Sequence, residues 1–178
     1  NTRCPVCRRP LRSETLAECF RYSHARNQRN LGLGHMDTKM SHLNYCSALA
    51  MSGKQQEALR ELGGMRQRAG VSLFAAVVEI EYANVLVELG FFNRAVRILH
   101  DVLAKMSSTK GSCHDRRFIG IQASLSMGCA LLQQDIYSQA KVFFMMGLQA
   151  CIGMEDRAHQ QLPYLKLMRG MSACLEGE

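Results

Sequence analysis

The sequence predicts an all-α fold, an α-solenoid of stacked antiparallel helical hairpins, and two observations carry this prediction. The first is composition: among 178 residues there are only three prolines but eleven methionines, and helix-favouring Ala, Leu, Gln and Arg are frequent. The second is a short pattern that occurs three times, in residues 51–62, 89–99 and 133–144. Because 47% of the residues are hydrophobic, the chain is also able to bury a core.

The repeated pattern is defined by residue size at fixed offsets from Gly53, Gly90 and Asp135. A small residue lies seven positions before each of these, and a leucine lies four positions before it. An alanine follows five positions after it, and a large apolar residue nine positions after it. In chain order these residues are Cys46, Leu49, Ala58 and Leu62, then Ala83, Leu86, Ala95 and Leu99, then Gly128, Leu131, Ala140 and Phe144.

Each offset has a physical role in a helical hairpin. The small residues on the two helices allow a close crossing. A Gly or Asp at the aligned position tolerates the left-handed backbone that ends the first helix. The large residue fills the gap to the next hairpin. A single hairpin cannot bury its apolar faces alone, so we expect the copies to stack.

The three units YCSALAMSGKQQEALREL, YANVLVELGFFNRAVRIL and MGCALLQQDIYSQAKVFF resemble the tetratricopeptide repeat (TPR) family. They match its small, Gly, Ala and aromatic or Leu positions, but the family's Trp and closing Pro are missing. The spacing is 37 residues from Gly53 to Gly90 and 45 from Gly90 to Asp135, against about 34 in the family. The resemblance implies a divergent, long-repeat array that forms a right-handed superhelix, as in adaptor and scaffold proteins.

The elements are expected in the following order. Residues 1–12 form a zinc-knuckle-like or extended segment, and residues 13–178 form the repeat domain. Residues 13–27, which open on Ser13 and an acidic Glu14, are either the second helix of an earlier unit or a cap. Three units are expected at about 37–66, 76–106 and 117–153. A partial unit at 159–178 has Gly170, Ala173 and Gly177 at its small, leucine-like and turn positions, and its second helix is expected beyond Glu178.

The resemblance also implies a binding groove, because the first helices of TPR units line a concave face that holds an extended peptide or a partner helix. The family's chaperone-binding members place cations there, and this chain does not, which argues against acidic C-terminal tails as ligands. Apolar and amide side chains favour an amphipathic segment of another protein. The alternative is that a helix of the same chain fills the groove. The implied groove residues are Leu43, Ser47, Met51, Ile80, Asn84, Glu88, Leu125, Cys129 and Gln133, with Met40, Ala50, Val77, Val87, Gln122 and Leu132 beside them.

The N-terminal stretch NTRCPVCRRPL contains a Cys-Pro-x-Cys motif, in which Cys4 and Cys7 would share one Zn²⁺. A tetrahedral site needs four ligands, and Cys19 and His24 would complete the set. The string CPVCRRP also resembles the closing knuckle of a RING finger, although the six preceding ligands of that family are not in this chain. We therefore expect either no cofactor or one structural zinc at the N-terminus.

The formal net charge is +7, and the first thirty residues hold a cluster of arginines, namely Arg3, Arg8, Arg9, Arg12, Arg21, Arg26 and Arg29. A solvated basic surface is one interpretation, and RNA binding through the basic N-terminal region is another. The leading functional prediction is a protein-interaction scaffold or adaptor. The first alternative is the substrate-recruiting part of a RING-type E3 ubiquitin ligase, and the second is RNA binding.

No residues form a catalytic set, because the Cys, His and Asp of residues 112–115 lack a partner base or an oxyanion device. The Met- and Phe-rich stretch 142–154 is expected to be core. No apolar run reaches the roughly 18 residues of a membrane span. Cys46, Cys129, Cys151 and Cys174 lie inside helical patterns as small core residues, which favours a reducing compartment, cytoplasm or nucleus.

Overall fold

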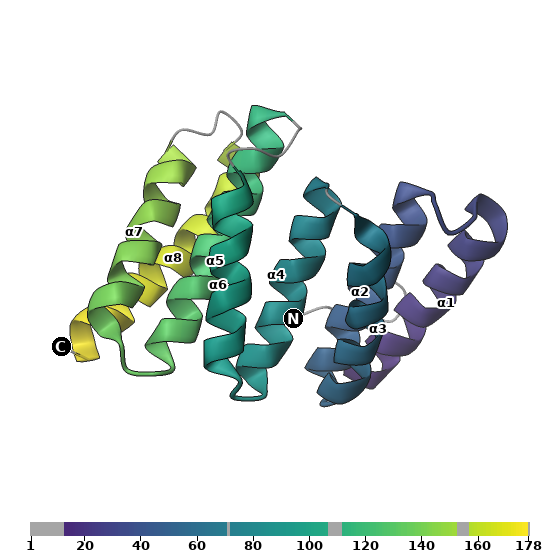
Figure 1. Cartoon of the computed structure of the whole chain (residues 1–178), viewed down its shortest axis with the longest axis horizontal. Coiled ribbons are helices and arrows are strands. Elements are labelled where there is room, and N and C mark those ends of the chain that lie inside the picture. The colour runs from purple at the N-terminus through teal and green to yellow at the C-terminus, as the bar shows by residue number, and fades with distance from the viewer. Residues whose placement is uncertain (1–12, 71, 107–111, 153–156, 178) are drawn as a thin grey trace. The chain divides into compact units, whose positions relative to one another are not determined.

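The computed structural model describes residues 13–70, 72–106, 112–152 and 157–177, and over these residues the chain is helical without strands (Figure 1). This confirms the predicted all-α class. The described helices are α1 (Ser13–Leu31), α2 (Met36–Met51), α3 (Gln55–Ala69), α4 (Leu73–Glu88), α5 (Phe92–Met106), α6 (Cys113–Leu132), α7 (Tyr137–Ile152) and α8 (Arg157–Gly177). The chain forms two compact units, Asn1–Met65 and Arg66–Glu178.

The three aligned turn residues adopt the left-handed backbone that the pattern requires. The φ angles are 82° at Gly53, 79° at Gly90 and 58° at Asp135, which is the one described non-glycine residue with a positive φ. Each turn closes with the same pair of backbone hydrogen bonds. At the first turn the N–H of Lys54 donates to Leu49 at 2.9 Å, and the N–H of Gly53 donates to Ala50 at 3.0 Å. These bonds satisfy carbonyls that a helix end would otherwise leave unpaired.

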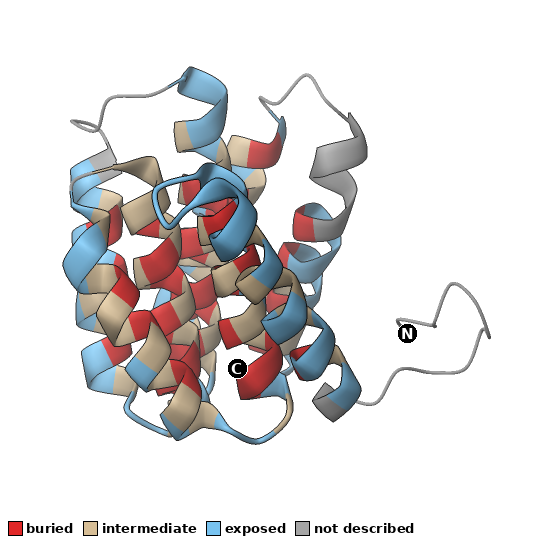
Figure 2. Ribbon diagram, turned by 90° about the vertical axis from the view of Figure 1, so that its right-hand side faces the viewer, coloured by how far each residue is buried: buried red, intermediate tan, exposed pale blue. Residues whose placement is uncertain are grey.

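The residues aligned around these turns form the core. Cys46, Ala83, Ala58, Ala95 and Ala140 are fully buried. The three large residues of the pattern are fully buried as well, namely Leu62, Leu99 and Phe144. The leucines four positions before each turn, Leu49, Leu86 and Leu131, are at most 4% exposed. Figure 2 shows that buried and exposed residues alternate along individual helices, as expected for amphipathic helices.

The N-terminal unit contains α1 and α2 as a packed pair, and α2 also contacts the part of α3 that belongs to this unit. Two side-chain contacts link α2 to α3. His42 Nε2 lies 3.0 Å from Oε2 of Glu61, and the hydroxyl of Tyr45 donates to Glu57 at 3.4 Å. The side chain of His24 on α1 reaches the carbonyl of Thr38 on α2 at 3.2 Å, and its ring is stacked on that of His42.

The C-terminal unit has two layers. The first layer consists of α4, α6 and α8, in which α4 contacts α6 and α6 contacts α8. The second layer consists of α5 and α7, and the described parts of these two helices do not contact each other. Helix α5 packs on α4 and α6, and α7 packs on α6 and α8. Each second-layer helix therefore bridges two first-layer helices, which is the arrangement expected of stacked hairpins.

Phe144 shows how one hairpin is joined to the following helix. A Cβ added at Gly128 would lie 2.7 Å from ring atoms of Phe144, and a Cβ added at Gly170 would lie 2.5 Å from its Cζ. The ring therefore occupies space that two glycines leave open, one on α6 and one on α8. This is the role that the pattern predicted for the large residue.

Two local expectations were wrong. Gly177, which the pattern placed at a turn, is still part of α8. The stretch 142–154 is only partly core: Phe144, Gly147 and Cys151 are buried, but Val142, Met145, Met146 and Ile152 are exposed. The reason is that α7 has neighbours on one side only within its unit, α6 and α8. No helix among the described residues combines the length and hydropathy that crossing a membrane requires.

Candidate protein-binding surface

The implied groove residues of the C-terminal unit lie on α4 and α6, both in the first layer. On α4, Ile80 is buried, Asn84 is half-buried and Glu88 is exposed. On α6, Leu125 and Cys129 are half-buried and Gln133 is exposed. Of these side chains, Ile80 therefore offers the least surface to a partner, and the other five are open to solvent to some degree.

In the N-terminal unit, α2 shows the same order of burial as α4. Leu43 is buried, Ser47 is half-buried, and Met51 is 67% exposed. The hydroxyl of Ser47 donates to the carbonyl of Leu43 at 3.2 Å, so this side chain is hydrogen-bonded within its own helix. Equivalent positions of α2 and α4 thus present one buried, one half-buried and one exposed residue.

Helix α8 adds apolar side chains to the first layer of the C-terminal unit, and the sequence analysis assigned none of them to the groove. Tyr164, Met168 and Leu175 are 41%, 45% and 59% exposed. With the half-buried Met171 they follow the spacing i, i+4, i+7 and i+11, which places them along one side of the helix. The same spacing can be read from the sequence, and it indicates that these four residues share one side of a helix.

The thiol of Cys129 is half-buried in this surface. Burial raises the pKa of Cys129, Cys174 adds to this increase, and Lys166 partly offsets it. At neutral pH the side chain is therefore a neutral thiol and behaves as a small apolar contact. The surface of α4, α6 and α8 can bury apolar groups and form hydrogen bonds with amides.

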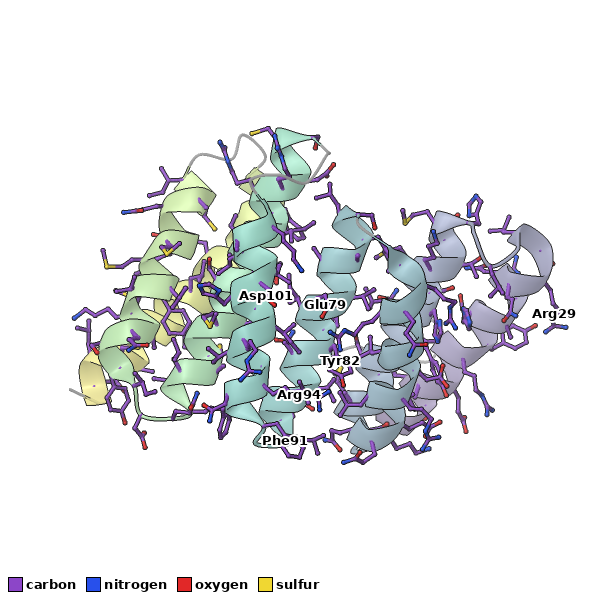
Figure 3. The ribbon with its side chains drawn as sticks, viewed as in Figure 1. Arg29, Glu79, Tyr82, Phe91, Arg94 and Asp101 are labelled. Carbon is purple, nitrogen blue, oxygen red and sulfur yellow. The ribbon has the colours of Figure 1, made fainter. Side chains whose placement is uncertain are left out.

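A separate cavity of about 380 Å³ lies between the end of α3, α4 and α5. Its wall includes an ion pair, in which Nη2 of Arg66 lies 2.8 Å from Oε2 of Glu79. The same guanidinium lies 4.3 Å from the ring centre of Tyr82, and Arg94 donates to the Tyr82 hydroxyl at 3.2 Å. Figure 3 shows Glu79 and Tyr82 on α4 beside Asp101 and Arg94 of α5. Since Arg66 and Glu79 neutralise each other, this cavity carries no strong charge of one sign.

The proposed zinc ligands fall in two groups. Cys4 and Cys7 lie outside the described residues. Cys19 is exposed on α1, and the ring of His24 is stacked on the ring of His42 with 4.3 Å between centroids. Within residues 13–70, 72–106, 112–152 and 157–177, no three His, Cys, Asp or Glu side chains are placed to hold a metal ion.

Comparisons with family models, with curated proteins and with solved structures give no match for this chain. The resemblance to TPR proteins therefore depends on the residues themselves.

Proposed function

We propose that this chain is a non-enzymatic protein-interaction module, which binds an amphipathic helix or extended segment of a partner protein on the first-layer surface of its C-terminal unit. The observation that carries the proposal is the continuity of that surface. Helix α4 contacts α6, and α6 contacts α8. Leu125 and Cys129 are half-buried on α6, and α8 exposes Tyr164, Met168 and Leu175.

The side chains on this surface define the chemistry of the partner. Leu125, Cys129 and Met168 offer apolar contact, and methionine adapts to partners of different shape. Asn84 and Gln133 offer amide groups for hydrogen bonds. Glu88 is the acidic residue among the implied groove positions. An amphipathic helix with apolar anchors at i, i+3, i+4 and i+7 and a basic flank suits this combination better than an acidic tail.

The two alternative functions remain predictions. The ligase hypothesis depends on Cys4 and Cys7, and the RNA hypothesis depends in part on arginines before Ser13. The ligase hypothesis therefore rests on residues outside the described part of the chain, whereas the RNA hypothesis also involves Arg21, Arg26 and Arg29, which are exposed on α1. No feature of the described helices favours either of them over protein binding.

A display library of helical peptides tests the proposal. We expect selection on the intact chain to enrich peptides with apolar residues at helical spacing. The Met168→Glu, Leu175→Glu double variant should weaken the selected peptides at least tenfold, because it puts two charges into the apolar contact. The control is Met146→Glu on α7, since Met146 and Met168 are similarly exposed, at 47% and 45%. Equal weakening by both variants, or no enrichment at all, would refute the proposal.

A further inference from the structure

Two histidine rings lie face to face in the contact between α1 and α2. His24 comes from α1 and His42 from α2, and the ring centres are 4.3 Å apart with 18° between the ring planes. The side chain of His42 is 13% exposed, and His24 is half-buried. Since α1 packs against α2, the stacked rings belong to the contact that holds α1 in place.

Each ring uses one nitrogen for a hydrogen bond, and both rings can do so while neutral. Nδ1 of His24 lies 3.2 Å from the carbonyl of Thr38, which only accepts, so this nitrogen carries a hydrogen. The same carbonyl accepts the hydroxyl of Ser41 at 2.9 Å. Nε2 of His42 lies 3.0 Å from Oε2 of Glu61, and it donates to this carboxylate in the same way.

A positive charge on both rings at once is not balanced, because one carboxylate, that of Glu61, lies beside two imidazoles. Two like charges at this separation disfavour the stacked arrangement by about fivefold in water, and by more where the rings are shielded from solvent. Burial lowers the pKa of His24 and so does His42, whereas the Thr38 carbonyl and Glu61 raise it. The stacked arrangement is therefore favoured while at least one ring is neutral.

The other charged groups around the pair do not supply a second counter-charge. Within five residues of these three side chains, the other charged residues of this unit are Arg21, Arg26 and Arg29 on α1, Asp37 and Lys39 on α2, and Glu57 and Arg60 on α3. Both acids have other partners: Glu57 accepts from the Tyr45 hydroxyl at 3.4 Å, and Asp37 lies 3.7 Å from Nδ1 of His35. Tyr45 is neutral in this pH range, because burial raises its pKa first and Glu57 adds to the increase.

We propose that the stacked pair is a pH-sensitive contact, at which uptake of a second proton releases α1 from α2 as the pH falls below about 6.5, while the C-terminal unit stays folded. The sign follows from linkage. The docked state holds His24 neutral, and the released state lets it titrate at its ordinary pKa of 6.5. Docking is therefore complete above that pH and weakens as the pH falls towards the lowered pKa of the docked state.

Release can be local because α1 is thinly covered. Ala17 is the one buried residue among residues 15–31, and Leu16 and Phe20 are half-buried. These three residues and His24 lie on one side of the helix, because their spacing repeats close to the helical period. A helix with so little buried surface opens at a lower cost than the unit as a whole. Acidification would thus uncover the apolar side of α1.

Hydrogen exchange of the intact chain, followed by mass spectrometry between about pH 7.5 and about pH 5, tests the proposal. After correction for the intrinsic pH dependence of exchange, the opening constant of α1 should rise at least about fivefold across this range. The opening constants of α4, α5 and α6 should change by less than about twofold, because the stacked pair lies in the other unit.

Three variants separate this contact from other causes. His24→Gln keeps a donor for the Thr38 carbonyl but takes up no proton, so it should abolish the response of α1; His42→Gln should do the same and serves if the first variant does not fold. His35→Asn is the control. Nδ1 of His35 accepts from the backbone N–H of Asp37 at 3.2 Å at the start of α2, and a proton there would remove that acceptor over the same pH range. Asparagine replaces this cap without titrating, so the response should persist.

Any of three results would overturn the proposal. These are an α1 opening constant that does not depend on pH, a loss of protection in both units together, and a response that survives in the folded His24→Gln or His42→Gln variant or disappears in His35→Asn. Peptide binding by the C-terminal unit at about pH 7.5, where the contact is closed, does not depend on this result. A failure here is therefore distinguishable from a failure of the proposed function.

Discussion

Replacing Gly128 with alanine would place a methyl group against the ring that joins α6 to α8. The new Cβ would lie 2.7 Å from Cδ1 and Cζ of Phe144, well inside the ordinary contact range of 3.4–4 Å. The ring cannot easily move away, because it is fully buried and its Cζ would lie 2.5 Å from a Cβ placed at Gly170. The strain must therefore be taken up by separating the helices or by rotating the ring away from its preferred rotamer.

The expected change in the free energy of unfolding is the difference between two terms. Overpacking a well-filled core costs about 1–3 kcal/mol. Replacing glycine by alanine inside a helix gains about 1 kcal/mol. Because the overlap is large and the ring is confined on two sides, we place the cost near the upper end of its range, and expect a net destabilisation of about 1–2 kcal/mol.

Gly120 supplies the matched control, since it lies in the same helix and a Cβ added there would meet nothing within 4 Å. Gly120→Ala should therefore stabilise the chain by about 0.5–1 kcal/mol. The two variants differ by about 2 kcal/mol, which corresponds to about 1 M urea between their unfolding midpoints for a typical slope. Urea titration followed by circular dichroism measures this difference.

The reasoning is refuted if Gly128→Ala is as stable as Gly120→Ala, because the Phe144 ring would then not confine the position. A double-variant cycle provides a second check. Shortening the ring by Phe144→Leu should make the Gly128→Ala substitution less costly, so the two effects should not be additive.

Three further predictions concern other parts of the chain. Gly90→Ala should destabilise by about 1 kcal/mol although the space around it is open, because its φ is 79°; equal urea midpoints would contradict this. Tyr82→Leu should cost about 1–2 kcal/mol through lost contact with the Arg66 guanidinium, whereas Tyr82→Phe should cost less than half of that, and thermal unfolding compares the two. The pKa of His24 is lowered, first by burial and then by the neighbouring His42, while the Thr38 carbonyl and Glu61 oppose the shift. Stability from this group is complete above pH 6.5 and declines as the pH falls towards the folded-state pKa, so His24→Gln should flatten this pH dependence in urea titrations at several pH values.

The expectations for the turns were confirmed because the turns depend on local interactions. A left-handed residue at Gly53, Gly90 or Asp135 is required by the chain's own geometry, and the bonds that close each turn join residues at most five apart. The binding surface was harder to anticipate. Tyr164 and Leu175 lie on α8, where the resemblance implied small and turn positions but no groove residues.

Helical periodicity by itself determined that this chain forms helices and which side of each helix is apolar, because both properties follow from spacing along one segment. Tertiary structure alone decided which apolar sides are covered. Ile80, assigned to a binding groove, is buried where α4 has both α5 and α6 as neighbours, whereas Met145 and Met146, assigned to the core, are exposed. Burial depends on neighbours that lie far away in the sequence, and the spacing of residues within one helix contains no information about them.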